Sequence, residues 1–100
     1  MMTTGPENQM VRRALAWANS LPDTKAIKIH GNAYMEEGTP DVLVIRQGVP
    51  LFLEGKQPGR DAEPIQRIRL KQWENVGAIV GVFHTLEEFQ DYVNRANQGG

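Results

Sequence analysis

Residues 38–56 read GTPDVLVIRQGVPLFLEGK. Two runs rich in β-branched and aromatic residues, 41–47 and 51–56, are separated by a short segment that contains glycine. Such a pattern is typical of a β-hairpin. We place Gly48 and Val49 at the two loop positions, and this choice fixes which residues of the two predicted strands face each other.

The predicted hairpin brings three charged side chains to one face. In this register Asp41 lies opposite Lys56, and Glu54 lies opposite Leu43. Diagonal neighbours across two strands are close enough for their side chains to meet. Carboxylates crowded on a partly buried face must be neutralised or hold a cation. We therefore expect Asp41 and Glu54 to bind a hard divalent ion such as Mg2+, with Lys56 holding a water molecule or a phosphate group.

The chain before the hairpin predicts one helix and one strand. Apolar residues recur at helical spacing over residues 6–19, where Pro6 suits the first helical position and Glu7 lies in the first turn. Residues 25–30 alternate as in a half-buried strand, with Lys28 on the outward face. Glycine, asparagine and proline between the two predicted strands indicate irregular backbone.

A second helix is predicted after a polar loop at residues 57–60. Asp61 is a candidate cap, the helix runs to about Val76, and Gly77 is its stop. Its expected buried stripe consists of Ile65, Ile68, Trp73 and Val76.

The remainder of the chain predicts a strand and a helix. Residues 78–84 form a nearly continuous apolar run, which is typical of a strand covered on both faces. Thr85 and Glu88 have capping-box spacing at the start of the last helix. The order αβββαβα predicts an α/β fold with a four-stranded mixed sheet flanked by helices, in a single domain over residues 1–100.

Composition limits the class of protein. The chain has 100 residues, 40% of them apolar and 23% charged, which fits one globular domain. It has no cysteine, so disulfides and cysteine-ligated zinc are excluded. Neither a secretory signal nor a membrane span is expected, and we predict a cytoplasmic protein.

Charge is unevenly distributed although the formal net charge is only −1. Residues 56–71 carry five basic side chains against two acidic ones, directly after the hairpin. Candidate phosphate contacts, which include one cation from the first strand, are Lys28, Arg60, Arg67, Arg69 and Lys71.

These motifs resemble a known nuclease signature. The Pro-Asp at residues 40–41 and the Glu-x-Lys at residues 54–56 are similar to the PD-(D/E)xK superfamily. Glu7, the segment 28–34 before Gly-x-Pro-Asp, and Gln66 with Gly77 eleven residues later resemble the VRR-NUC (virus-type replication-repair nuclease) family. The resemblance covers roughly residues 7–90. The middle of Glu-x-Lys, commonly apolar in the family, is Gly55, where we expect a bulge or close approach of the DNA backbone.

The resemblance implies a restriction-endonuclease-like core and Mg2+- or Mn2+-dependent hydrolysis of DNA. Asp41 and Glu54 would be metal ligands, and Glu7 an auxiliary acid that reaches the metal through water. Lys56 would orient the water or the phosphate, and Gln66 would support Lys56 or the water. Small stand-alone members of bacterial or phage type resemble dimeric enzymes that cut branched DNA, including four-way (Holliday) junctions, in DNA repair.

Chain size independently favours a homodimer. A domain this small offers little surface against the roughly 1,000 Å2 or more that specific DNA interfaces bury. A twofold dimer would also supply the two active sites that symmetric junction cleavage needs.

Several alternatives stay open at this point. The same chemistry suits a nuclease for flaps, single strands or continuous duplex. The fold also suits a catalytically inactive DNA-binding module, and the three charges suit an accidental surface cluster.

Overall fold

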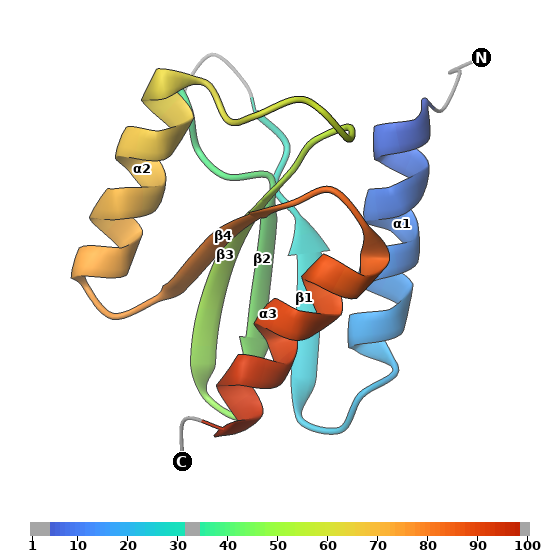
Figure 1. The fold of residues 1–100 in the computed structure, drawn as a ribbon. Helices are drawn as coiled ribbons and strands as arrows, with labels where there is room; N and C mark the ends of the chain where they lie inside the picture. Colours follow the sequence, from blue (N-terminus) through green and yellow to red (C-terminus); the bar gives the residue numbers. More distant parts are fainter. Residues whose placement is uncertain (1–4, 32–34, 99–100) are drawn as a thin grey trace.

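A computed structural model describes residues 5–31 and 35–98. The elements are α1 (Pro6–Asn19), β1 (Thr24–Lys28), β2 (Val42–Arg46), β3 (Val49–Gly55), α2 (Pro64–Asn75), β4 (Ile79–Phe83) and α3 (Leu86–Gln98). The predicted order αβββαβα is confirmed (Figure 1). Positions 32–34 of the family-like motif lie outside the described residues.

The four strands form one mixed sheet in the order β1-β2-β3-β4. β1, β2 and β3 pair antiparallel, whereas β3 and β4 pair parallel. A parallel pair requires a crossover connection, and α2 provides it. The predicted fold class, an α/β fold with a mixed four-stranded sheet between helices, is confirmed.

The β2–β3 turn differs from the predicted one. Val42 pairs with Leu53, so the loop residues are Gln47 and Gly48 instead of Gly48 and Val49. Both have positive φ, 51° and 82°, as in the primed turns that match the twist of a hairpin. Glycine accommodates this conformation at no steric cost.

The corrected register changes the partner of Asp41. Extending the ladder by one pair places Asp41 opposite Glu54, and neither the predicted pairing with Lys56 nor that of Leu43 with Glu54 occurs. Directly opposed residues share a face, so the two carboxylates lie closer together than predicted.

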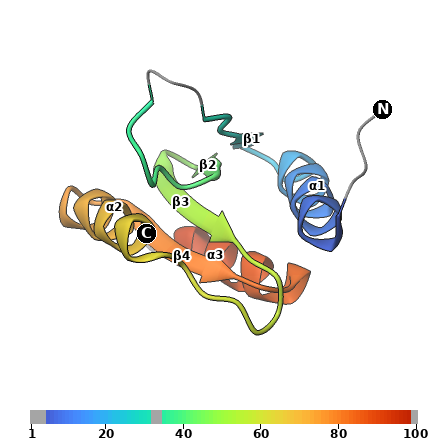
Figure 2. The same ribbon diagram turned by 90° about the horizontal axis from the view of Figure 1, so that it is seen from above.

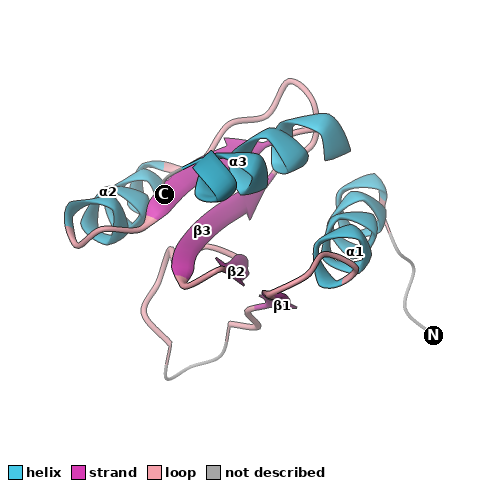
Figure 3. Ribbon diagram, turned by 90° about the horizontal axis from the view of Figure 1, so that it is seen from below, coloured by secondary structure: helices cyan, strands magenta, loops and turns pink. Residues whose placement is uncertain are grey.

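Helices cover both faces of the sheet. α1 packs mainly on β1, and α3 contacts β2, β3 and β4 on the same side (Figure 3). α2 packs on β3 and β4 from the opposite side, which is clear in the view along the sheet in Figure 2. The core lies under α1 and α3, where Val44, Leu51, Phe83 and Phe89 are inaccessible to solvent.

The second helix begins later than predicted and buries a narrower stripe. Its N-cap is Glu63, not Asp61. Ile68 and Val76 are 52% and 78% exposed, while Leu70 is buried. The predicted stripe was too wide because α2 contacts only the β3–β4 half of the sheet. Trp73 lies on this contact and stacks on Phe52, with ring centroids 4.0 Å apart.

The two edge strands are less covered than their sequences suggest. β4 is contacted by a helix on each face, as predicted, yet only Phe83 within it is fully buried because one edge of the strand is free of a neighbouring strand. In β1, Ala26 is buried and Ile27 is exposed. Lys28 therefore lies on the face that α1 covers, not on the predicted outward face.

No helix within residues 5–31 and 35–98 has the length and apolar character needed to cross a membrane.

Candidate active site

The turn before β2 packs closely against α2 because it contains a glycine. Gly38 has φ of 83°, and a Cβ there would lie 2.9 Å from the carbonyl oxygen of Ile65. The chain can pass this close only without a side chain. Pro40 follows and is fully buried. This contact explains the Gly-x-Pro-Asp spacing, because it fixes the position of Asp41 at the start of β2.

Asp41 bridges β2 and β3. Its Oδ1 accepts a hydrogen bond of 3.1 Å from the N–H of Gly55. Its backbone carbonyl accepts one of 2.8 Å from the N–H of Ile29. The residue is thus fixed to strands on both sides, with one carboxylate oxygen engaged by the backbone.

Glu54 lies in β3 with only 5% of its surface exposed. Its Oε2 accepts a hydrogen bond of 3.1 Å from Nε2 of Gln66. Its Oε1 is buried and, among the described residues, has no hydrogen-bond partner. A buried carboxylate oxygen without a donor is costly, so this atom marks a position for a cation or a proton.

Burial and mutual repulsion perturb both acids. Burial, followed by the negative charge of Asp41, raises the pKa of Glu54 to about 7, although Lys56 opposes the shift. Burial also raises the pKa of Asp41, opposed by the Gly55 N–H and by the charge of Lys28. Two close carboxylates resist simultaneous ionisation unless a positive charge joins them.

The residues present fit a divalent metal ion held in part by water. Two opposed carboxylates, one with an unpartnered oxygen, provide the hard ligands that Mg2+ and Mn2+ take. No group of three or more His, Asp or Glu residues in the described part of the chain is arranged to hold a metal. A zinc-type cage is therefore not formed, and Mg2+ commonly uses one or two carboxylates and keeps water.

Glu7 is not part of a direct ligand group with Asp41 and Glu54. Its negative charge makes a small contribution to the raised pKa of both acids, and Glu7 lines one groove together with Lys56. This placement suits the predicted contact through water and not a direct metal bond.

Gln66 binds the carboxylate of Glu54, and its predicted support of Lys56 or of the water stays a prediction. Its Oε1 accepts the N–H of Glu63 at 2.8 Å and its Nε2 donates to Glu54. The amide therefore caps the start of α2 and orients Glu54 with its two ends.

Lys56 follows directly after β3. Its N–H donates to the carbonyl of Phe83 at 3.0 Å, which extends the parallel pairing by one residue. Its charge lowers the pKa of Glu54, so the ammonium lies within electrostatic reach of that carboxylate. Asp41 and Glu54 share one face of the sheet, and the prediction that Lys56 shares it with them stays a prediction.

Gly55 faces the protein core. A Cβ there would lie 3.0 Å from Val11 and 3.1 Å from the ring of Phe83. The β3 register is continuous through this residue, so there is neither the expected bulge nor an opening toward DNA. Glycine is needed because α1 and β4 approach closely.

Gly55→Val is expected to destabilise the fold by roughly 1–3 kcal/mol through overpacking. A lowered urea midpoint would show the effect. Gly31→Val, at a position with open space around it, is the control and should unfold near the wild-type midpoint. Unchanged stability together with weakened DNA binding would instead favour the expected DNA approach.

The predicted phosphate contacts fall into two groups. In the first group, Lys28 donates to Asn8 at 3.3 Å and its charge opposes the rise in the pKa of Asp41, while Arg60 lies in the loop between β3 and α2. The other three are engaged in local ion pairs. Arg67 pairs with Asp61, Arg69 with Glu36 and Lys71 with Glu74. That these five side chains contact phosphates stays a prediction.

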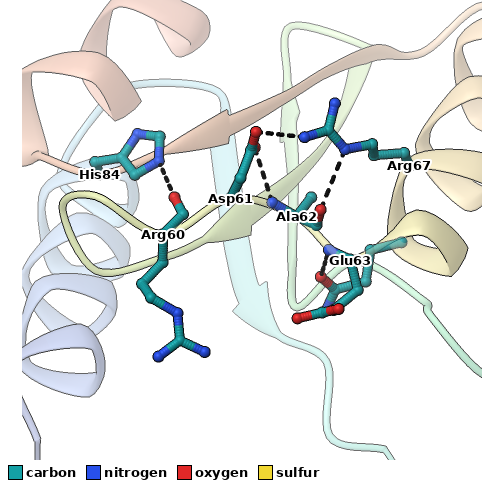
Figure 4. A network of polar contacts seen from close by, with 7 residues as sticks. Arg60, Asp61, Ala62, Glu63, Arg67 and His84 are labelled. Atoms are coloured by element: carbon teal, nitrogen blue, oxygen red, sulfur yellow. Dashed lines mark hydrogen bonds and ion pairs between the residues drawn. The ribbon is translucent and has the colours of Figure 1, made fainter.

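His84, directly after β4, binds the loop between Lys56 and α2. Sequence reasoning did not predict this role. Its Nε2 lies 2.8 Å from the carbonyl oxygen of Arg60, and its Nδ1 lies 3.0 Å from Oε1 of Glu88. Figure 4 shows the ring pointing at the Arg60 backbone, with Asp61 bound to Ala62 nearby. Both ring nitrogens face acceptors, so the imidazolium form suits the site.

Glu88, which contacts His84, forms a modified version of the predicted capping box. Thr85 accepts the N–H of Glu88 at 3.1 Å, as predicted. The carboxylate of Glu88 accepts the N–H of His84, one residue earlier than the capping-box rule gives.

His84→Gln is expected to destabilise the protein most in acid. The Arg60 carbonyl and then Glu88 raise the pKa of His84. Its contribution is complete below its unfolded pKa, about 6.5, and is lost as the pH rises through the folded pKa. Melting temperatures from pH 5.5 to 9 should show the difference from wild type shrinking with pH. A constant difference, or the same trend in the exposed-site control His30→Gln, would contradict this assignment.

The overall fold is similar to that of several solved structures. One, titled "VRR_NUC domain", is 23% identical with a TM-score of 0.74, and the match covers 88% of this chain and 94% of that one. Another, "VRR_NUC domain protein", is 14% identical with a TM-score of 0.75, and covers 99% of this chain and 93% of that one. No sequence-family model and no curated protein sequence matches.

The chain is an α/β domain whose four-stranded mixed sheet carries an opposed pair of carboxylates, Asp41 and Glu54. The chain has the fold of the VRR_NUC domain over most of its length, which confirms the fold expected from the sequence resemblance. At these identities the likeness concerns the fold, and the chemistry is argued below from the chain's own residues.

Proposed function

We propose that the protein is a divalent-metal-dependent DNA endonuclease that hydrolyses phosphodiester bonds in branched DNA, with four-way junctions as its substrate. The observation that carries the proposal is the opposed pair Asp41 and Glu54, in which a buried oxygen of Glu54 has no partner among the described residues. The VRR_NUC fold and the Glu-x-Lys spacing support it.

Each group at this end of the sheet has a distinct task in hydrolysis. Asp41 and Glu54 would hold Mg2+ or Mn2+. When bound, the metal supplies a water of lowered pKa and neutralises charge that develops on the phosphate. Lys56 would hold that water or the scissile phosphate through its ammonium group. Gln66 keeps Glu54 oriented, and Lys28 and Arg60 would contact flanking phosphates.

A panel of labelled DNA substrates tests the proposal. Four-way junctions, flaps, splayed arms, single strands and continuous duplex are incubated with Mg2+, Mn2+ or EDTA. Metal-dependent cleavage near branch points is the expected result, and cleavage of flaps alone would change the substrate within the same chemistry. If no substrate is cut and calorimetry detects no Mn2+ binding, the protein is an inactive DNA-binding module.

The active form is expected to be a homodimer. One domain of this size covers too little DNA for a specific site of roughly 1,000 Å2, and two related cuts need two sites. Sedimentation at micromolar concentration should give twice the chain mass of 11.2 kDa. A monomer that still makes paired cuts in a junction would refute the dimer.

A further inference from the structure

A groove of about 580 Å3 lies beside the acidic pair. It is lined by the N-terminal turns of α1 and α3, by the loop after β3 and by the connection between β4 and α3. Glu7 and Lys56 line it, so the groove is continuous with the candidate active site. Its volume lies within the roughly 300–1,000 Å3 typical of small-molecule sites.

The lining suits a flat, largely neutral group with polar edges. Met10, Pro58 and Leu86 provide apolar surface, and the amides of Gln57 and Gln90 provide both donors and acceptors. Nucleobases removed from a helix are held in this way, between apolar surfaces and hydrogen bonds to their edges.

The charges of the groove favour a base over a run of phosphates. Arg13, Lys56 and the imidazolium form of His84 contribute positive charge, while Glu7 and Glu87 contribute negative charge, so the two signs nearly balance. A channel that follows a nucleic-acid backbone is instead predominantly positive. The groove therefore matches one base, with Lys56 at the mouth able to meet the adjoining phosphate.

We infer that the groove takes one unpaired nucleobase of the DNA strand that is cut, from the nucleotide next to the scissile phosphate. The inference rests on the proposed function and narrows it. Substrates would need an unpaired or easily unpaired nucleotide at the cleavage point. Branch points supply one, whereas extrusion from continuous duplex costs unstacking and unpairing energy.

Base entry can be measured without cleavage. We would place 2-aminopurine, whose fluorescence rises when it leaves the base stack, at each branch-point nucleotide in turn and form the complex in EDTA. Gln90→Phe fills the groove from α3, and Gln57→Phe fills it from the exposed loop. Gln72→Phe, on the exposed surface of α2, is the matched control. Fluorescence anisotropy verifies that each protein is bound.

A fluorescence rise at one nucleotide with wild type and Gln72→Phe, but not with the groove variants, is the expected result. In Mg2+ the groove variants should cut branched DNA about tenfold more slowly. No rise at any position in the bound complex, or an equal rise with Gln90→Phe, would overturn the inference. If DNA is cleaved but the fluorescence does not rise, base binding in the groove is refuted and the proposed nuclease function is retained. If the fluorescence rises but DNA is not cleaved in Mg2+ or Mn2+, base binding is supported and the nuclease function is refuted.

Discussion

Asp41→Asn is expected to lower metal-dependent cleavage by about 10³-fold or more, because a metal-held transition state loses several kcal/mol with a ligand charge. Asparagine keeps an oxygen that can accept the Gly55 N–H, so the hairpin should remain intact. Cleavage of a four-way junction in single-turnover assays measures the loss, and binding in EDTA should change little.

Asp23→Asn is the matched control. It makes the same chemical change in the α1–β1 connection, where φ is 53° and asparagine is well tolerated. Lys56→Ala should lower cleavage comparably, and Lys25→Ala on exposed β1 should not. Cleavage by Asp41→Asn within tenfold of wild type would contradict the assignment of this carboxylate.

The second large effect is expected from Glu54→Gln, which should stabilise the metal-free protein at pH 8 while removing its response to metal. Burial and Asp41 raise the pKa of Glu54 from 4.5 to about 7. The folded protein therefore binds a proton more tightly than the unfolded chain, and its stability falls as the pH rises through this window. Above pH 7 the penalty is fully present.

Glutamine stays neutral, so the variant avoids the cost of a second buried negative charge beside Asp41. We expect a gain of about 2 kcal/mol at pH 8, which is roughly 10 °C in the melting temperature of a domain this size. Below the unfolded pKa the gain should vanish. Mn2+ should raise the melting temperature of wild type but not of the variant.

Calorimetric or fluorescence melts from pH 4 to 9, with EDTA or Mn2+, would measure both effects. Glu37→Gln, a change at an exposed acid, should melt like wild type throughout. A wild-type protein whose metal-free stability increases between pH 5 and 8 would show that Glu54 is not held at a raised pKa.

The sequence predicted the face of the acidic pair although it misplaced the turn. Moving the loop from Gly48–Val49 to Gln47–Gly48 shifts each partner by two residues. A strand repeats its orientation every two residues, so Asp41 and Glu54 stay on one face in either register. The exact partner depended on positive φ at Gln47, which an L side chain rarely adopts and which the sequence did not indicate.

Other features depended on tertiary contacts that the sequence does not reveal. Periodicity placed Ile68 and Val76 in the core, but α2 touches only part of the sheet. Gln66 was chosen for the site from its family-like position, yet its partner became clear only with Glu54 beside it. The role of His84 could not be predicted, because its acceptors come from a loop and a helix separated in sequence.

The side-chain amide of Gln66 connects the first turn of α2 to the carboxylate of Glu54. Fraying of the first turn of α2 would release Glu54, so the temperature at which activity declines should follow local opening of this turn and can precede global unfolding. The loop between β3 and α2 can therefore change in length and sequence during evolution only where the side chain of Gln66 still contacts Glu54.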